Sequence, residues 1–255
     1  MLLAIDVGNT NIVIGVFREE TLLHTWRLAT VRERTADELG ILVANLCERR
    51  AIQPADITGI VIASVVPQLT GTLVTMVSDF FGRVPLLFEP VNGPMPIRYD
   101  NPDEVGADRV VNAMAAFDRY DRGEPIIVVD FGTATTFDAV SARGEYLGGV
   151  ICPGPQISAD ALFQRAARLP RIDVKRPLQV IGTNTVASMQ SGLFWGYVDM
   201  VEGLVRRMKA ELGGAAVVVA TGGLASVVAP ESALIEHVDP DLTLRGLRLV
   251  WDHRQ

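Results

Sequence analysis

The sequence predicts an α/β protein built from two similar halves, and two observations carry this prediction. Short apolar runs typical of strands alternate along the chain with stretches of helical periodicity. A turn of acid, glycine and hydroxyl residues lies between two apolar runs at residues 6–11 (DVGNTN) and again at residues 130–136 (DFGTATT). Asp6 and Asp130 are separated by about half of the 255-residue chain. The repeat therefore indicates an internal duplication.

The first half is expected to begin with three short strands joined by tight turns. Thr35 and Glu38 have the spacing of a capping box, and the apolar residues after them repeat on one helical face. The predicted elements are strands at residues 2–7, 11–17 and 21–29, a helix after Thr35, a buried strand at 59–65, a helix at 68–81, a strand at 84–88 and a helix that carries Val110, Ala113, Met114 and Phe117.

The second half repeats the strand, turn and strand pattern and then becomes more helical. Its predicted elements are strand, turn and strand at residues 125–137, a hairpin segment at 144–149, helices near 156–168 and 184–212, and a buried strand at 217–223. No linker is evident, so we expect residues 1–117 and 118–255 to form two halves that pack together.

Composition limits the classes of partner. Apolar residues make up 49% of the chain and charged residues 21%, as in ordinary soluble globular proteins. The net charge of −7 argues against a nucleic-acid partner, because a phosphate backbone requires a cationic surface. ATP remains compatible with this charge, since backbone N–H groups and a metal ion can hold its phosphates.

The expected localisation is cytoplasmic. Cys47 and Cys152 are too few for a disulfide framework and do not have the spacing of metal ligands. Residues 1–5 lead directly into Asp6 without a basic region or a cleavage site, so no secretory signal is expected. No uncharged apolar stretch reaches the roughly 18 residues of a membrane span. We therefore expect no membrane partner.

Small-residue turns follow three of the predicted strands, at Gly8, at Gly132 and at residues 222–223. Glycine lets backbone amides approach a phosphate closely, and the hydroxyls of Thr10 and Thr133 can donate further hydrogen bonds. A single turn of this kind is equally consistent with an ordinary β-hairpin. The three turns together predict a binding cleft for a nucleoside triphosphate.

Two carboxylates accompany these turns. Asp6 and Asp130 repel a phosphate directly but can hold a cation that bridges to it. The chain contains neither the G-x-x-x-x-G-K-[ST] pattern of a P-loop nor the G-x-G-x-x-G fingerprint of dinucleotide-binding proteins. The sequence therefore predicts a different nucleotide site, with a metal ion beside the triphosphate.

The duplicated turns resemble those of the superfamily that includes acetate kinase, sugar kinases, Hsp70 and actin. More narrowly, a series of segments over nearly the whole chain resembles the type III pantothenate kinases. The segments are DVGNTN at 6–11, EVGADRVVN at 104–112, DFGTATTFD at 130–138, GGVICPG at 148–154, NTVASMQSG at 184–192, ATGG at 220–223 and DPDLTLRGL at 239–247. The resemblance implies duplicated ribonuclease H-like domains of the actin, Hsp70 and sugar kinase type, with an ATP cleft between them.

The resemblance also implies site residues. The ATP-binding positions are Asp6, Val7, Gly8, Asn9, Thr10, Asn11, Ile12, Val13 and Thr133. The substrate-binding positions are Tyr99, Gly106, Ala107, Asp108, Arg109 and Thr185. Asp130 matches the ligand of a monovalent cation, K⁺ or NH₄⁺, and Asp6 is a position for Mg²⁺ held through the phosphates of ATP.

Asp108 matches the catalytic base of the family. A carboxylate at this position can take the proton from the primary alcohol of pantothenate as the γ-phosphoryl group arrives. The guanidinium group of Arg109 can form two hydrogen bonds with the carboxylate of the substrate. From the residues alone, a solvated pair at the start of a helix is the preferred interpretation of Asp108 and Arg109, since acids favour a first helical turn.

The resemblance implies a homodimer in which Thr185 reaches the site of the neighbouring subunit. The alternative role for Thr185 is to cap its own helix. The helix at 184–212 is the predicted dimer helix, although core packing alone also accounts for its apolar stripe. The residues of that stripe include Met189, Leu193, Phe194, Tyr197, Met200, Val201 and Leu204.

The predicted function is ATP-dependent phosphorylation of pantothenate to 4'-phosphopantothenate, the first step towards coenzyme A. One alternative is a nucleotide-binding regulatory homologue without kinase activity, because a fold alone does not define a function. Intact Asp6, Asp108 and Asp130 favour the enzyme. A kinase of another small acid or sugar would share the ATP turns but lack the EVGADR segment.

Overall fold

The computed structural model describes residues 1–254, which divide into two compact units. Unit 1 comprises Met1–Pro96, Asp100–Ala115 and the chain from Leu242 onward, and unit 2 comprises Ile97–Tyr99 and Ala116–Asp241. The sequence predicts a boundary after residue 117, with the C-terminal segment in the second half. The C-terminal segment instead packs within unit 1.

Unit 1 is built on a five-stranded sheet with the order β3-β2-β1-β4-β5. β1 pairs antiparallel with β2 and parallel with β4. The elements are β1 (Leu2–Val7), β2 (Asn11–Arg18), β3 (Thr21–Ala29), α1 (Ala36–Glu48), η1 (Pro54–Asp56), β4 (Gly59–Ser64), α2 (Pro67–Phe81), β5 (Leu86–Leu87), η2 (Pro90–Asn92), η3 (Pro102–Glu104), the start of α3 (Ala107–Tyr120), and α7 (Leu242–His253).

Unit 2 contains a second five-stranded sheet with the order β10-β9-β6-β7-β8. β6 pairs antiparallel with β7 and parallel with β9. The elements are β6 (Ile126–Phe131), β7 (Ala134–Val140), β8 (Tyr146–Pro153), α4 (Pro155–Arg165), α5 (Thr185–Glu211), β9 (Val217–Gly222), α6 (Ala225–Val228), η4 (Ala229–Glu231) and β10 (His237–Val238). Starting from β8, the order and directions of these strands repeat those of unit 1, which confirms the predicted duplication.

Most of the predicted elements are confirmed. The Thr35 side chain accepts from the N–H of Glu38, and the Glu38 side chain accepts from the N–H of Thr35, so the capping box forms and α1 begins at Ala36. β5 spans only two residues, whereas the prediction covered residues 84–88; Val84 is exposed, which explains why its apolar character misled the prediction.

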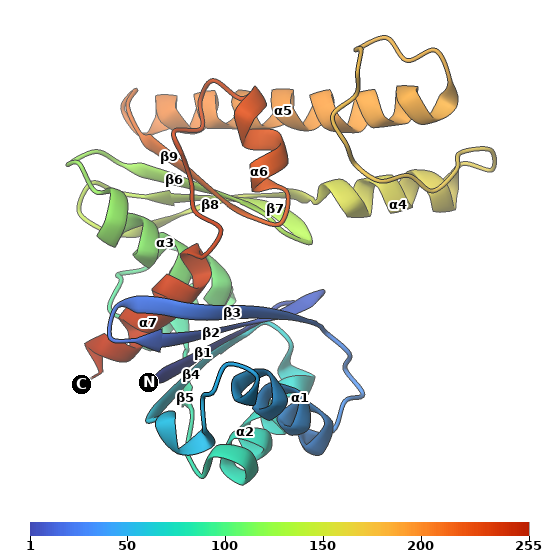
Figure 1. Cartoon of the computed structure of the whole chain (residues 1–255). Helices are drawn as coiled ribbons and strands as arrows, with labels where there is room; N and C mark the ends of the chain where they lie inside the picture. The colour runs from blue at the N-terminus through green and yellow to red at the C-terminus, as the bar shows by residue number, and fades with distance from the viewer. Residues whose placement is uncertain (255) are drawn as a thin grey trace. The chain divides into compact units, whose positions relative to one another are not determined.

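A large hydrophobic cluster of each unit lies on one face of its sheet. α1 and α2 cover one face of the unit 1 sheet, and α5 lies along one face of the unit 2 sheet (Figure 1). Alternate residues of β1 and of β6 point into these cores, namely Leu3, Ile5, Val7, Ile127, Val129 and Phe131. Asp6 and Asp130 therefore lie at equivalent positions in their strands. Each lies on the face of its own sheet that is turned away from these cores.

α7 was not among the predicted elements, and it packs on the sheet face opposite α1 and α2 (Figure 1). A Cβ atom at Gly246 of α7 would lie 2.0 Å from the carbonyl oxygen of Val111, so α7 and α3 are in backbone contact. The hydroxyl of Thr243 donates to Oδ1 of Asn112 at 2.7 Å. α7 therefore fixes the first turns of α3, where Asp108 lies.

Candidate active site

The first loop joins β1 to β2 and is closed by backbone hydrogen bonds. The N–H of Gly8 donates to the carbonyl oxygen of Asn11 at 3.0 Å, and a Cβ atom at Gly8 would lie 3.2 Å from that oxygen. Asn9 and Thr10 are exposed at the tip of the loop, while Asp6 is half-buried at its base. The loop therefore presents small polar groups on a constrained backbone, as a phosphate loop requires.

Thr30 and Arg32, which no sequence motif indicated, support this loop from the end of β3. The hydroxyl of Thr30 donates to the carbonyl oxygen of Gly8 at 2.7 Å, and its N–H donates to that of Thr10 at 3.0 Å. Nη2 of Arg32 lies 3.5 Å from Oδ1 of Asn9. These contacts follow from the register of β2 with β3, in which Asn11 lies opposite Ala29 and Thr30 comes next along the chain. A prediction of the contacts would have required that register.

The second loop joins β6 to β7 and is one residue shorter than the first. Within this loop, the N–H of Gly132 donates to the carbonyl oxygen of Ala134 at 3.0 Å. Gly154, at the start of α4, braces the loop: its N–H donates to the carbonyl oxygen of Thr133 at 3.1 Å. A Cβ atom at Gly154 would lie 2.2 Å from that oxygen and 2.6 Å from the carbonyl oxygen of Gly132. Only glycine at residue 154 accommodates this loop.

The ATGG segment lies beside Asp130. Gly222 has a φ of +90°, and a Cβ atom there would lie 2.4 Å from Oδ1 of Asp130. Thr136 of β7 and Thr221 of β9 pair with Asp130 from either side. The structure thus gathers one carboxylate and two hydroxyl residues on neighbouring strands at the end of this sheet.

Asp108 lies in the first turn of α3. Its Oδ1 accepts from the N–H of Arg109 at 2.9 Å and would lie 2.6 Å from a Cβ atom at Gly106. Burial raises the pKa of Asp108, while the hydrogen bond from the Arg109 backbone and the charge of Arg109 oppose the shift. Arg109 is itself only 8% exposed. This environment suits a carboxylate that accepts a proton, rather than a solvated pair.

Tyr99 and Thr185 belong to unit 2. The ring of Tyr99 lies 3.4 Å from the position of a Cβ atom at Gly148, which has a φ of +118°. The N-cap of α5 is Asn184, whose side chain accepts from the N–H of Ala187 at 2.9 Å. Thr185 is exposed at the first residue of the helix. The alternative in which Thr185 caps the helix is therefore wrong.

The two units hold different parts of the predicted site. Unit 1 carries residues 6–13 and 106–109, whereas unit 2 carries Tyr99, Asp130, Thr133 and Thr185. Across residues 1–254, no three His, Cys, Asp or Glu side chains are grouped to hold a metal ion. In the same part of the chain, no helix has the length and hydropathy to cross a bilayer.

The repeated sheets and their Asp-x-Gly turns define the duplicated ribonuclease H-like fold of the sugar kinases, Hsp70 and actin. A putative 2-dehydro-3-deoxygalactonokinase from Sinorhizobium meliloti has a TM-score of 0.61 at 15% identity, covering 100% of this chain and 99% of that one. A putative Baf family transcriptional activator from Campylobacter jejuni has a TM-score of 0.56 at 18% identity, covering 99% and 97%. At these identities the likeness shows the fold alone.

Sequence relatives identify the family. The sequence model of the type III pantothenate kinases matches residues 2–207. A type III pantothenate kinase of Moorella thermoacetica is 54% identical over 99% of both chains, and one of Myxococcus xanthus is 58% identical over 98% of both. The chain belongs to the type III pantothenate kinase family.

Proposed function

We propose that this protein transfers the γ-phosphoryl group of ATP to the primary hydroxyl of pantothenate, the first step of coenzyme A synthesis. The partly buried Asp108 carboxylate beside buried Arg109 carries this proposal, together with the family membership. A coupled assay of ATP consumption with and without pantothenate tests it. Consumption that depends on pantothenate is expected. ATP binding without such consumption would instead support the regulatory alternative.

Asp108 is the proposed general base. Its carboxylate accepts the proton of the pantothenate hydroxyl as the oxygen attacks the γ-phosphorus atom. The raised pKa of Asp108 increases its affinity for that proton. Arg109 binds the carboxylate of pantothenate through its guanidinium group, and Tyr99, Gly106, Ala107 and Thr185 provide further contacts.

ATP is bound by residues 6–13 of the first loop and by Thr133 of the second. Backbone N–H groups and the hydroxyls of Thr10 and Thr133 donate to phosphate oxygens, which fits an acidic chain without a P-loop lysine motif. Catalysis of phosphoryl transfer depends mainly on positioning the phosphates and stabilising their charge, and these contacts provide the positioning.

The donor groups fit the two expected cations. Mg²⁺ usually keeps several waters and takes one or two carboxylates together with substrate phosphates, so the single carboxylate of Asp6 is sufficient. Asp130, flanked by Thr136 and Thr221, offers hard oxygen donors to a monovalent cation, K⁺ or NH₄⁺. When bound, these ions neutralise charge on the phosphates during transfer.

We expect turnover to depend on the monovalent cation through Asp130. Sodium as the only monovalent cation should give lower turnover than potassium or ammonium. Na⁺ is smaller than the other two ions, so the same oxygen atoms would have to move closer together to bind it. Asp130→Ala should remove the difference between the salts. Steady-state rates in the three chlorides at equal ionic strength test this, and equal wild-type rates would contradict it.

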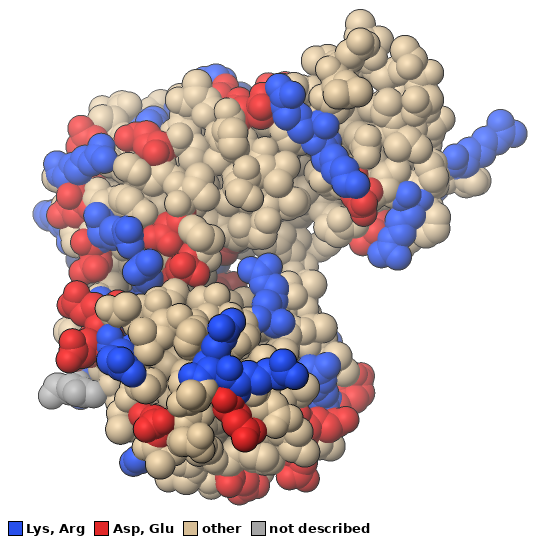
Figure 2. Space-filling model, in the orientation of Figure 1, with Lys and Arg blue, Asp and Glu red and all other residues tan. Residues whose placement is uncertain are grey.

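We also propose that the protein is a homodimer. The apolar stripe of α5 packs inside unit 2, as the core-packing alternative predicts. Large apolar side chains are exposed elsewhere, on α4, on the segment between α4 and α5, and at the start of α5; they are Ile157, Leu162, Phe163, Leu178, Val180, Ile181 and Val186. In Figure 2 the top of this region carries no charged side chains, whereas Lys and Arg side chains lie along its lower edge and one projects from its side. Exposed apolar surface of this extent is typical of an interface.

Complementation tests whether Thr185 completes the partner's site. Thr185→Ala and Asp108→Asn subunits should each be impaired alone. In a mixed dimer, one site carries both defects and the other carries neither. Random exchange in a two-fold dimer should therefore return roughly a quarter of wild-type activity. No recovery, with subunit exchange confirmed by mass spectrometry, would mean that each subunit builds its own site.

A further inference from the structure

A short strap, residues 97–99, connects two segments of unit 1 but packs on unit 2. Ile97 forms a parallel bridge with Tyr146 at the start of β8, and the N–H of Arg98 donates to the carbonyl oxygen of Tyr146 at 2.7 Å. A segment this short has little buried surface of its own. Its position therefore depends on a few specific contacts.

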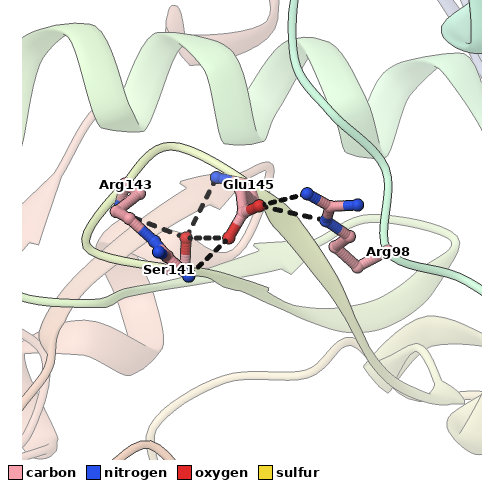
Figure 3. Close-up of polar contacts among 4 residues, drawn as sticks. All are labelled: Arg98, Ser141, Arg143 and Glu145. Atoms are coloured by element: carbon pink, nitrogen blue, oxygen red, sulfur yellow. Dashed lines mark hydrogen bonds and ion pairs between the residues drawn. The ribbon is translucent and has the colours of Figure 1, made fainter.

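The main side-chain contact of the strap is an ion pair (Figure 3). Nε and Nη2 of Arg98 donate to Oε1 of Glu145 at 3.0 and 2.7 Å. Glu145 is held in turn by Ser141, whose hydroxyl donates to Oε2 at 3.3 Å and accepts from the N–H of Glu145 at 3.1 Å. The hydrogen bond from Arg98 lowers the pKa of Glu145, so the carboxylate stays ionised at neutral pH.

The residue after Arg98 is Tyr99. Its ring lies over Gly148 and has its centroid 6.4 Å from that of Tyr146. Tyr146 is fully buried, and its hydroxyl donates to Oδ1 of the buried Asp138 at 2.8 Å. Tyr99 therefore packs on a buried and hydrogen-bonded residue of β8, whereas the strap that carries it depends on the few contacts described above.

We propose that the ion pair between Arg98 and Glu145 is a positioning device that holds Tyr99 for pantothenate binding. This inference rests on the proposed role of Tyr99 as a pantothenate contact. Arg98 is largely exposed, with 64% of its side chain accessible, and exposed ion pairs contribute little to stability. The ion pair instead fixes the orientation of the strap. Two donors on the planar guanidinium group of Arg98 constrain both its direction and its distance from Glu145.

Arg98→Gln should raise KM for pantothenate by about tenfold, since displacing a positioning contact by 1 Å costs up to about 10²-fold. KM for ATP and the melting temperature should stay near wild type. Glu145→Gln should have the same effect, and the double variant should be no worse than either single variant, because all three remove one interaction. Arg98→Lys should give an intermediate KM.

Arg143→Gln is the matched control. Arg143 is also an arginine beside Glu145, but its Nη2 lies 3.6 Å from Oε2, and it lies on the opposite side of Glu145 from Arg98 (Figure 3). Its KM for pantothenate should not change.

Additive effects of Arg98→Gln and Glu145→Gln would overturn the inference, as would a rise in both KM values. An effect of Arg98→Gln alone would mean that Arg98 contacts the substrate directly, which also overturns it. Absence of pantothenate turnover in the wild type would contradict the proposed function itself, so the two failures are distinguishable.

Discussion

Asp108→Asn should lower kcat by about 10²–10⁴-fold, the usual contribution of a general base. The amide has nearly the same shape as the carboxylate but cannot accept the proton of the pantothenate hydroxyl. ATP binding should persist, because no proposed ATP contact is changed. Steady-state kinetics with both substrates measures this. Turnover near wild type would remove Asp108 from the role of base.

The dependence of kcat/KM on pH provides a second test of Asp108 as the base, with the same variant. Wild-type kcat/KM should fall as pH decreases through the pKa of Asp108, and this pKa should lie above the ordinary carboxyl range because burial raises it. Asp108→Asn should lack this acidic limb.

Stability should move in the opposite direction from activity. A carboxyl group with a raised folded-state pKa is harder to ionise in the folded protein than in the unfolded chain. Asp108 therefore lowers stability as pH rises from its unfolded pKa to its raised folded pKa, and the full loss remains at higher pH. At neutral pH, Asp108→Asn should melt no lower than wild type. Asp118→Asn, an exposed change on the same helix, is the matched control and should alter neither rate nor profile.

Gly154→Ala should raise KM for ATP by about tenfold or more. A tenfold rise corresponds to a loss of about 1.4 kcal/mol of binding free energy. The backbone φ of Gly154, −70°, is accessible to alanine, so the effect is steric rather than conformational. The new Cβ atom would lie 2.2 Å from the carbonyl oxygen of Thr133 and would displace the second loop. Overpacking of this kind also destabilises by about 1–3 kcal/mol.

Gly71→Ala is the control for Gly154→Ala. Gly71 lies inside α2 with open space where a Cβ atom would be placed. Alanine there should stabilise the protein by roughly 0.5–1 kcal/mol, because glycine is a poor helix former, and it should leave both KM values unchanged. If Gly154→Ala binds ATP normally while its melting temperature falls, the second loop does not contact the nucleotide.

Much of the fold could be predicted from local patterns. The strands around Asp6 and Asp130 alternate or run apolar between tight turns, and the capping box at Thr35 marks the start of α1 unambiguously. Each of these signals lies within about ten residues of the element that it defines. The duplicated strand order then follows from repetition of the same pattern.

The missed features depend on contacts between distant residues. α7 is recognisable only as an amphipathic helix, and its place beside α3 comes from the contact of Gly246 with Val111, which no local pattern contains. The brace of the first loop by Thr30 and of the second by Gly154 likewise depends on strand register and close approach.

Site residues were predicted by motif, but their environments were not. The GADR segment identified Asp108, whereas burial of the carboxylate beside Arg109 became visible only in the folded chain. At the start of α5 the sequence left Thr185 with two roles, because Asn184 and Thr185 are both good N-cap residues. The structure assigns the cap to Asn184, which leaves the exposed hydroxyl of Thr185 for another partner.

The most direct test of the central claim is to identify the product. The purified protein is incubated with ATP, Mg²⁺, K⁺ and pantothenate, and the mixture is analysed by mass spectrometry and ³¹P NMR. The account predicts ADP and a phosphomonoester of pantothenate in equal amounts, with Asp108→Asn producing far less of both under the same conditions. Formation of ADP without phosphorylated pantothenate, or no reaction in the wild type, would contradict it.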